Sequence, residues 1–236
     1  MALALVKLAQ IGAEIGEIAE IDINPLLAGP DGVLVIAASV RLAPFEGAVE
    51  TRLAIRPYPS ELEKHVAARD GRELLLRPIR PEDEPALRTF VRELTPEDRR
   101  LRFFSHVKEL DARLAARLTQ IDYDREMALV LTDPSANDTA ILGVMRISAD
   151  PDGAHAEYAG AVRSDLKGLG LGRLLLQEIC ECARRRGIGE VWGEVLAENA
   201  PMLALVRKLG FSVQVSEEDR SVVIVRLPLQ QIPAEL

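Results

Sequence analysis

The stretch that decides the fold is "DLKGLGLGRLLLQEI", residues 165–179, in which three glycines alternate in front of an apolar helical segment. Glycine has no Cβ atom, so its backbone can adopt conformations closed to other residues and can approach a ligand closely. Successive N–H groups at the start of a helix, together with the positive end of the helix dipole, favour a bound phosphate. The pattern therefore predicts a phosphate-binding turn, and its spacing limits which phosphate is bound.

Two nucleotide-binding motifs that use similar glycines do not fit this spacing. A P-loop needs Gly, four residues and then Gly-Lys-Ser/Thr, but Arg173 stands five residues after Gly168. A dinucleotide-binding Gly-x-Gly-x-x-Gly would need its last glycine at Arg173 or Leu175. The alternatives left open are another phosphate ligand or a glycine-rich helix start that binds nothing.

The elements around the turn predict a mixed α/β domain rather than regular βαβ repeats. A strand "ELLLRPIR" precedes helices that begin at Pro81 and, with Thr95 as N-cap, at Pro96. A third helix, "DARLAARLTQI", leads into three strands joined by turn residues. The long helix is expected over 168–186. The remaining segments are, in order, the strand "EVWGEVLAE", the helix "NAPMLALVRKLG" and the strands "FSVQVS" and "RSVVIVRL".

The N-terminal part of the chain has a different pattern. Residues 3–15 predict a short amphipathic helix, and the strand-like runs "IAEIDINPLL" and "VLVIAASVRL" are joined by the turn "AGPDG". A helix and a hairpin are too small to bury a core alone. We therefore expect an appendage over 1–44, a linker over 45–60 and the main domain over 61–236.

Composition limits the classes of function. The chain has 236 residues, 48% of them apolar, and its net charge of −8 disfavours nucleic acid or an anionic membrane as the main partner. We find neither a signal peptide nor an apolar run of the ~20 residues that a membrane span needs, so a cytoplasmic protein is expected. The three histidines are widely separated, and no metal site is predicted. Cys180 and Cys182, two apart on one predicted helix, cannot form a disulfide with each other.

Three ordered segments over about 70–230 resemble the GNAT family of N-acetyltransferases. Residues 167–172 are similar to the family motif Gln/Arg-x-x-Gly-x-Gly/Ala, with lysine in place of the usual first residue; the strand "AEYAGAV" precedes it and "ENAPMLALVRKLGFSV" follows. The resemblance implies the GNAT fold, with a mixed, mostly antiparallel sheet flanked by helices, and acetyl-CoA as co-substrate. The residues that it implies for cofactor binding are Ala161, Val162, Lys167, Gly168, Leu169, Gly170, Leu171, Gly172, Arg173 and Asn199. For Asn199, helix capping is an equally good explanation.

Two further stretches narrow the resemblance. "LTPEDRRLRFF" and "IDYDREMALV" look like the acetyltransferase domain of bacterial Pat-type protein lysine acetyltransferases. In those proteins the domain is fused to a region like an ADP-forming acyl-CoA synthetase, and residues 17–42 are similar to the last strands of its ATP-grasp domain. Asn24 matches a magnesium-holding position of that fold, whereas Ala37 stands where the metal-binding Asp is expected. We therefore expect a remnant without ATP chemistry.

The family resemblance assigns Glu157, in "AEYAGAV", as the general base for an acceptor amine. A lysine amine has a pKa of about 10.4, so a base must remove its proton before it attacks the thioester. His155 is the rival base on the same strand face, and a solvated Glu157 without a catalytic role is the bland alternative. Many family members protonate the leaving thiolate with a Tyr at the position of Val206. Without that acid, a thiol of pKa about 8.5 is still a tolerable leaving group.

The expected reaction is transfer of an acetyl group to a lysine of a protein, with acyl-CoA synthetases among the implied acceptors. A small-molecule amine acetyltransferase and a non-catalytic acyl-CoA-sensing module are the alternatives. A deep closed acceptor pocket would favour a small acceptor, and a wide groove would favour a protein. The oligomeric state is not indicated by the sequence.

Overall fold

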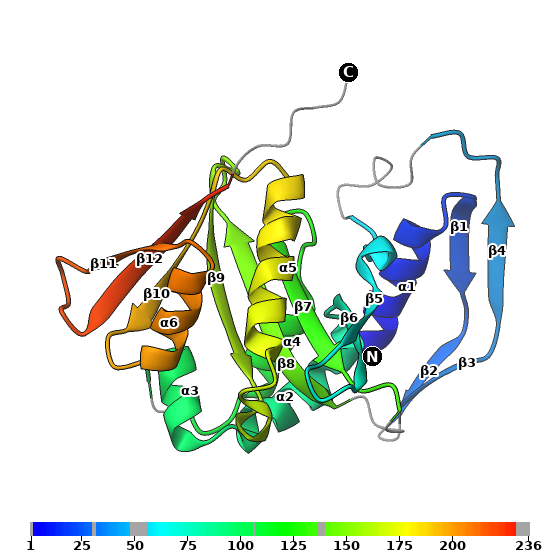
Figure 1. Ribbon diagram of the computed structural model, residues 1–236. Helices are drawn as coiled ribbons and strands as arrows, with labels where there is room; N and C mark the ends of the chain where they lie inside the picture. Colours follow the sequence, from blue (N-terminus) through cyan, green and yellow to red (C-terminus); the bar gives the residue numbers. More distant parts are fainter. Residues whose placement is uncertain (1, 30–31, 48–55, 106, 136–139, 230–236) are drawn as a thin grey trace. The chain divides into compact units, whose positions relative to one another are not determined.

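The computed structural model describes residues 2–29, 32–47, 56–105, 107–135 and 140–229 (Figure 1). The chain divides into two compact units. One comprises Met1–Pro59 with Asp122–Asp124, and the other comprises Ser60–Ile121 with Arg125–Leu236. The finer division of the first unit into an appendage over 1–44 and a linker over 45–60 stays a prediction.

Among its described residues, the N-terminal unit contains one helix and a long, interrupted hairpin. Helix α1 (Ala2–Glu14) is followed by β1 (Ile18–Ile23), which pairs antiparallel with β4 (Ala38–Leu42), and by β2 (Leu26–Gly29), which pairs with β3 (Gly32–Val35). The predicted helix and strand runs are present, and the tip of the predicted turn, residues 30–31, lies outside the described residues. Many large apolar side chains of this unit face solvent: Leu5, Ile11, Ile15, Leu27, Leu34, Val35, Ile36, Val40 and Leu42.

The second unit is built on an eight-stranded sheet with the order β11-β12-β10-β9-β8-β7-β6-β5. Neighbouring strands are antiparallel except β9 and β10, which are parallel. The mostly antiparallel mixed sheet confirms the fold class expected from the sequence. β5 is a short edge strand that the sequence pattern did not indicate. The strands are β5 (Lys64–Ala67), β6 (Glu73–Pro78), β7 (Glu126–Thr132), β8 (Ile141–Ala149), β9 (His155–Val162), β10 (Glu190–Leu196), β11 (Ser212–Val215) and β12 (Val222–Pro228).

Helices cover both faces of this sheet. On β9, Ala161 lines a pocket with side chains of α2 (Glu84–Glu93), whereas a Cβ atom on Gly172 of α5 (Leu171–Arg185) would contact Val162. Because successive residues of a strand point to opposite faces, α2 and α5 lie on opposite sides. The remaining helices are α3 (Pro96–Phe103), α4 (Ala112–Thr119), α6 (Ala200–Lys208) and the short 3-10 turns η2 (Ser60–Leu62), η3 (Pro81–Asp83) and η4 (Ser164–Leu166).

Helix starts follow the local sequence, with one correction. The Thr95 hydroxyl accepts the N–H of Asp98 at 3.1 Å, as predicted for the N-cap of α3. Pro81 begins a 3-10 turn, and α2 follows directly at Glu84. The long helix expected over 168–186 begins only at Leu171, because Gly168 and Gly170 have left-handed φ angles of 84° and 83°. These angles interrupt the helical hydrogen bonding and leave Gly168 and Gly170 in a loop before the helix.

The core on the α2 side contains the fully buried side chains of Phe90, Leu94 and Leu110. On the other side, Cys180 and Cys182 are buried free thiols of α5, as the spacing predicted. Burial raises the pKa of the Cys180 thiol to about 12, so the thiol is inert at neutral pH. Both cysteines therefore serve packing.

Candidate active site

The glycine loop leaves backbone N–H groups without helical partners at the start of α5. The first bond of the helix runs from the Leu174 N–H to the Gly170 carbonyl at 3.0 Å, so the preceding N–H groups have no acceptor within the helix. A Cβ atom on Gly170 would lie 3.0 Å from Arg69 Nε, which adds to the left-handed strain. A Cβ atom on Gly172 would make only ordinary contacts, so that glycine is not required by the protein's own packing. Its place in the helix's first turn leaves room for a close ligand.

Lys167 is held by α3. Its ammonium group forms an ion pair with Asp98, and the carboxylate also accepts the hydroxyls of Ser164 and Thr95. Burial raises the pKa of the Asp98 carboxyl, but the hydrogen bonds from Lys167, Ser164 and Thr95 outweigh it and hold that pKa below its ordinary value. This network fixes the loop against α3. Lys167 thus has a structural role in addition to its place in the motif.

Strands β9 and β10 separate in front of the loop. The two strands pair only at His155–Glu190, Ala156–Val191 and Glu157–Trp192. Beyond Glu157, β9 remains paired with β8, and beyond Trp192, β10 remains paired with β12. Figure 1 shows β9 and β10 diverging toward their C-terminal ends. The gap exposes one backbone edge of β9 between the glycine loop and Glu157.

The amides on that edge belong to even-numbered residues. The Arg163 N–H donates to the Leu142 carbonyl of the β8 side at 2.8 Å, and antiparallel bonding alternates along β9. The amide of Ala161 therefore points toward β8, and those of Gly160 and Val162 point into the gap. Gly160, which the sequence reasoning did not single out, has no space for a Cβ atom because the Val144 carbonyl and the Met145 sulfur would each lie 2.5 Å away. The Ala161 side chain lies on the α2 side of the sheet, where it lines a pocket.

Glu157 lies on the α2 side of β9, where β9 and β10 begin to separate. It is exposed, and its register neighbours are Ser148 of β8 and Trp192 of β10. Partial burial and the negative charge of Glu194 raise the pKa of the Glu157 carboxyl, whereas Arg102 opposes the shift. A carboxylate with a raised pKa is a stronger base than an ordinary one. His155, the rival base, is exposed at the start of β9, 3.6 Å from Asp150.

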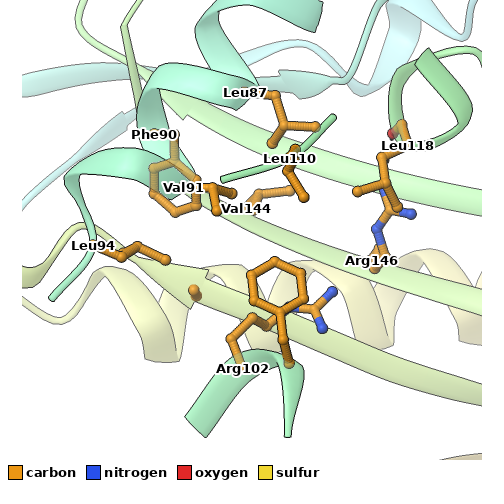
Figure 2. A pocket seen from close by; sticks show the side chains of 11 residues that line it. Leu87, Phe90, Val91, Leu94, Arg102, Leu110, Leu118, Val144 and Arg146 are labelled. Carbon is orange, nitrogen blue, oxygen red and sulfur yellow. Dashed lines mark hydrogen bonds between the residues drawn. The ribbon is translucent and has the colours of Figure 1, made fainter. Parts of the chain in front are cut away.

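A narrow pocket of about 20 Å³ lies on the same face as Glu157. Apolar side chains of α2 form one wall, and Arg102 of α3 stands on the opposite side (Figure 2). Arg146 of β8 lines the pocket beside Leu118 (Figure 2). The Arg146 guanidinium donates a hydrogen bond to the Leu118 carbonyl at 2.7 Å. The volume holds about one water molecule. The sequence reasoning did not find this pocket, because its residues come from six separate segments.

The other predicted residues are placed as follows. The Asn199 side chain accepts a hydrogen bond from the Met202 N–H at 3.2 Å and caps α6. Helix capping was one of the two explanations that the sequence supported equally for this residue. Arg173 is exposed in the first turn of α5, beside the glycine loop. Val206 is fully buried in α6 and carries no titratable group. The usual position of the general acid is therefore used for packing.

Comparisons with known proteins agree with this geometry. A family model described as an acetyltransferase (GNAT) domain matches residues 73–212, and one described as an ATP-grasp domain matches residues 1–42. An acetyltransferase of Pseudomonas aeruginosa is 34% identical over 160 residues, which cover 68% of this chain and 86% of that protein. The chain therefore belongs to the GNAT acetyltransferase family.

Solved structures show the same fold. The GNAT domain of PAT from S. lividans aligns with a TM-score of 0.67 at 27% identity, covering 73% of this chain and 99% of that chain. A GNAT-superfamily phosphinothricin acetyltransferase from Sinorhizobium meliloti, in complex with AcCoA, aligns with a TM-score of 0.55 at 20% identity, covering 68% and 91%. The protein is an N-acetyltransferase of this family, with acetyl-CoA as its acetyl donor. Among the described residues, no helix combines the length and apolarity that crossing a bilayer requires.

Proposed function

We propose that this chain transfers the acetyl group of acetyl-CoA to the ε-amine of a lysine on a protein substrate, with Glu157 as general base. The observation that carries the proposal is the position of Glu157 on the edge of the gap between β9 and β10. The glycine loop at the start of α5 lies at the other end of the same gap. A donor thioester held along β9 and an amine beside Glu157 would therefore meet.

The donor half of this site is made of backbone groups. The N–H groups of the first turn of α5, with the positive end of its dipole, would hold the pyrophosphate of coenzyme A. Residues 167–173 supply this cradle, and Gly172 leaves the main chain accessible. The amides of Gly160 and Val162 point into the gap and would donate to the pantetheine arm and to the thioester carbonyl, as an oxyanion hole does.

The acceptor half is made of side chains. Glu157 and Glu194 lie on adjacent strands, and Glu194 acts electrostatically on Glu157. Two carboxylates attract a cationic amine, and Glu157 would then take its proton directly or through water. The neutral amine attacks the thioester carbon, the carbon–sulfur bond breaks, and the coenzyme A thiolate leaves, while the nitrogen gives its second proton to water as the amide forms. Because Val206 supplies no acid, the thiolate would take a proton from water.

The protein acceptor is supported by the similarity to the PAT domain and by the Pat-like segments of the sequence; acyl-CoA synthetases are the first acceptors to test. A small amine is the second candidate, since the carboxylates of Glu157 and Glu194 would attract any cationic amine. We also propose that the ATP-grasp-like residues 1–42 carry no ATP chemistry of their own, because Ala37 stands where that fold's metal-binding Asp is expected.

The test is product identification. The chain is incubated with acetyl-CoA and, in separate reactions, an acyl-CoA synthetase, lysine peptides and small amines. Coenzyme A release and the acetylated atom are measured by thiol assay and mass spectrometry. The proposal predicts one acetyl-lysine for each coenzyme A released. Acetylation of small amines alone would select the second candidate, and coenzyme A binding without transfer would favour an acyl-CoA sensor.

A further inference from the structure

Two guanidinium groups share the narrow pocket near Glu157. Arg102 comes from α3 and Arg146 from β8 (Figure 2). Arg146 is anchored by the Leu118 carbonyl, and its guanidinium is also 4.0 Å from Glu126. Within the described part of the chain, Arg102 has no hydrogen-bond acceptor or ion-pair partner, and its guanidinium carbon lies 5.0 Å from the ring centre of Phe103. Arg102 therefore holds a charge without a protein anion in contact.

The surroundings of Arg102 make this arrangement costly. Burial and the positive charge of Arg146 lower the pKa of Arg102 to about 10, and Glu157 is the acid that opposes the shift. The Arg102 side chain is half-buried, and a guanidinium withdrawn from water is normally satisfied by a carboxylate or phosphate in a forked arrangement. The apolar walls formed by α2 side chains offer no such group. The Arg102 charge in this pocket is therefore not balanced by an anionic group in contact with it.

We infer that the Arg102–Arg146 pocket is a subsite for a carboxylate carried by the acceptor, several bonds away from the amine that reacts at Glu157. The charges on this face are separated in a way that fits such a molecule. Glu157 and Glu194 stand at one end for the ammonium group, and the two arginines stand further along β9 for the carboxylate. The volume of about 20 Å³, room for about one water molecule, admits a carboxylate oxygen between the two guanidinium groups rather than a whole side chain.

The strand register sets the distance between the two ends. Arg146 is paired with Ala159, two residues from Glu157, and the pocket extends to Ala161. At about 3.3 Å per residue, the carboxylate subsite lies roughly 7–13 Å from the base along the strand. The two groups of an α-amino acid are too close together to span this distance. An ε-amine of lysine can span it to its own α-carboxylate or to a neighbouring acidic side chain.

This inference rests on the proposed transfer to an amine and adds the acceptor's second recognition group. The test uses two matched acceptor pairs. One pair is a lysine peptide with a Glu or a Gln beside the lysine, and the other is Nα-acetyl-lysine or its amide. The pairs distinguish a neighbouring acidic residue from the molecule's own carboxylate. In the wild type we expect kcat/KM to be about 10- to 100-fold higher for the acid member of at least one pair.

The variant Arg102→Gln should reduce this acid-to-amide ratio to near one, whereas Arg113→Gln, a change of an exposed arginine on α4, should keep it. A merely structural Arg102 would lower activity toward both members equally. A ratio near one in the wild type, or an unchanged ratio in Arg102→Gln, would overturn the subsite and leave amine acetylation standing.

A binding measurement separates the two proposals. With Glu157→Gln and coenzyme A present, calorimetry should show weaker binding of the amide member than of the acid member in at least one of the two pairs. Equal binding of acid and amide would again overturn the subsite. Absence of acetylation of all four acceptors by the wild type would count against the proposed function, while the calorimetry would still decide the subsite.

Discussion

The donor half and the acceptor half of the proposed site are built from different materials. At the glycine loop, the important features are backbone conformations: the left-handed angles of Gly168 and Gly170 and the free N–H groups that follow them. At Glu157, the important features are side-chain charges from separate elements. The first half therefore tolerates many side-chain changes but few changes at glycine. The second half is sensitive to isosteric changes that only remove a charge.

The largest expected effect is in the acceptor half. Glu157→Gln keeps the shape of the side chain and removes the base, so kcat/KM for the acceptor should fall by about 10²- to 10⁴-fold. The KM for acetyl-CoA should change little, because the glycine loop is untouched. Steady-state kinetics checks both values. Glu97→Gln, at an exposed position of α3, is the control and should leave them unchanged.

In the donor half, a substitution should change the KM for acetyl-CoA. Gly170→Ala places a Cβ atom on a residue with a left-handed φ angle, at a cost of about 1–2 kcal/mol. The loop should shift to relieve this strain. The KM for acetyl-CoA should rise about 5- to 30-fold.

Gly187→Ala is the matched control for this variant, since Gly187 has a φ of 78° at the other end of α5. It should lose a similar stability without a change in KM. If the two variants had the same KM for acetyl-CoA, the role of the loop would be contradicted.

A smaller effect is expected where α3 holds the loop. Asp98→Asn removes the ion pair with Lys167 and should lower the free energy of unfolding by about 1–2 kcal/mol at pH 7. The pKa of Asp98 is lowered in the folded protein, so its stabilisation is present above the ordinary carboxyl pKa of 3.8 and is lost as the pH falls through the folded value. Urea unfolding at pH 7 and pH 3 should therefore show a difference that shrinks at pH 3. A difference independent of pH would point to lost packing instead.

The smallest effect concerns Tyr158. Its hydroxyl is buried without a hydrogen-bond partner among the described residues, and burial raises its pKa. Removing an unsatisfied polar group costs little, so Tyr158→Phe should change the free energy of unfolding by no more than about 0.5 kcal/mol, or stabilise the protein. A loss above about 1 kcal/mol in chemical denaturation would show that the hydroxyl has a partner.

The same contrast explains what the sequence could predict. The glycine loop, the Thr95 cap and the strand before the loop are contiguous patterns, and the structure contains them in the expected order. Local patterns did not show that the Ala161 amide points toward β8, because that depends on the register with a neighbouring strand. The meeting of Arg102 and Arg146 could not be predicted either. It requires α3 to pack over β8 and β9, a tertiary arrangement that has no local signal.

The N-terminal unit shows the limit of local patterns in another way. Its helix and strands follow from the sequence, but its exposed apolar side chains do not by themselves give it a function. Its match to the ATP-grasp model covers only residues 1–42. The acetyltransferase account therefore rests on the second unit.

The measurement that tests the central claim most directly is the pH dependence of kcat/KM in the wild type, Glu157→Gln and Glu194→Gln. Glu157 acts as a base only when ionised, so kcat/KM should rise with pH through its raised pKa. Glu194→Gln removes a negative charge that raises the pKa of Glu157. Its removal favours the ionised form of Glu157, so the acidic limb should move to lower pH. In Glu157→Gln this limb should disappear, leaving only the rise that follows ionisation of the acceptor amine, whose pKa is about 10.4. If the limb at the Glu157 pKa persists in Glu157→Gln, or stays in place in Glu194→Gln, Glu157 is not the base.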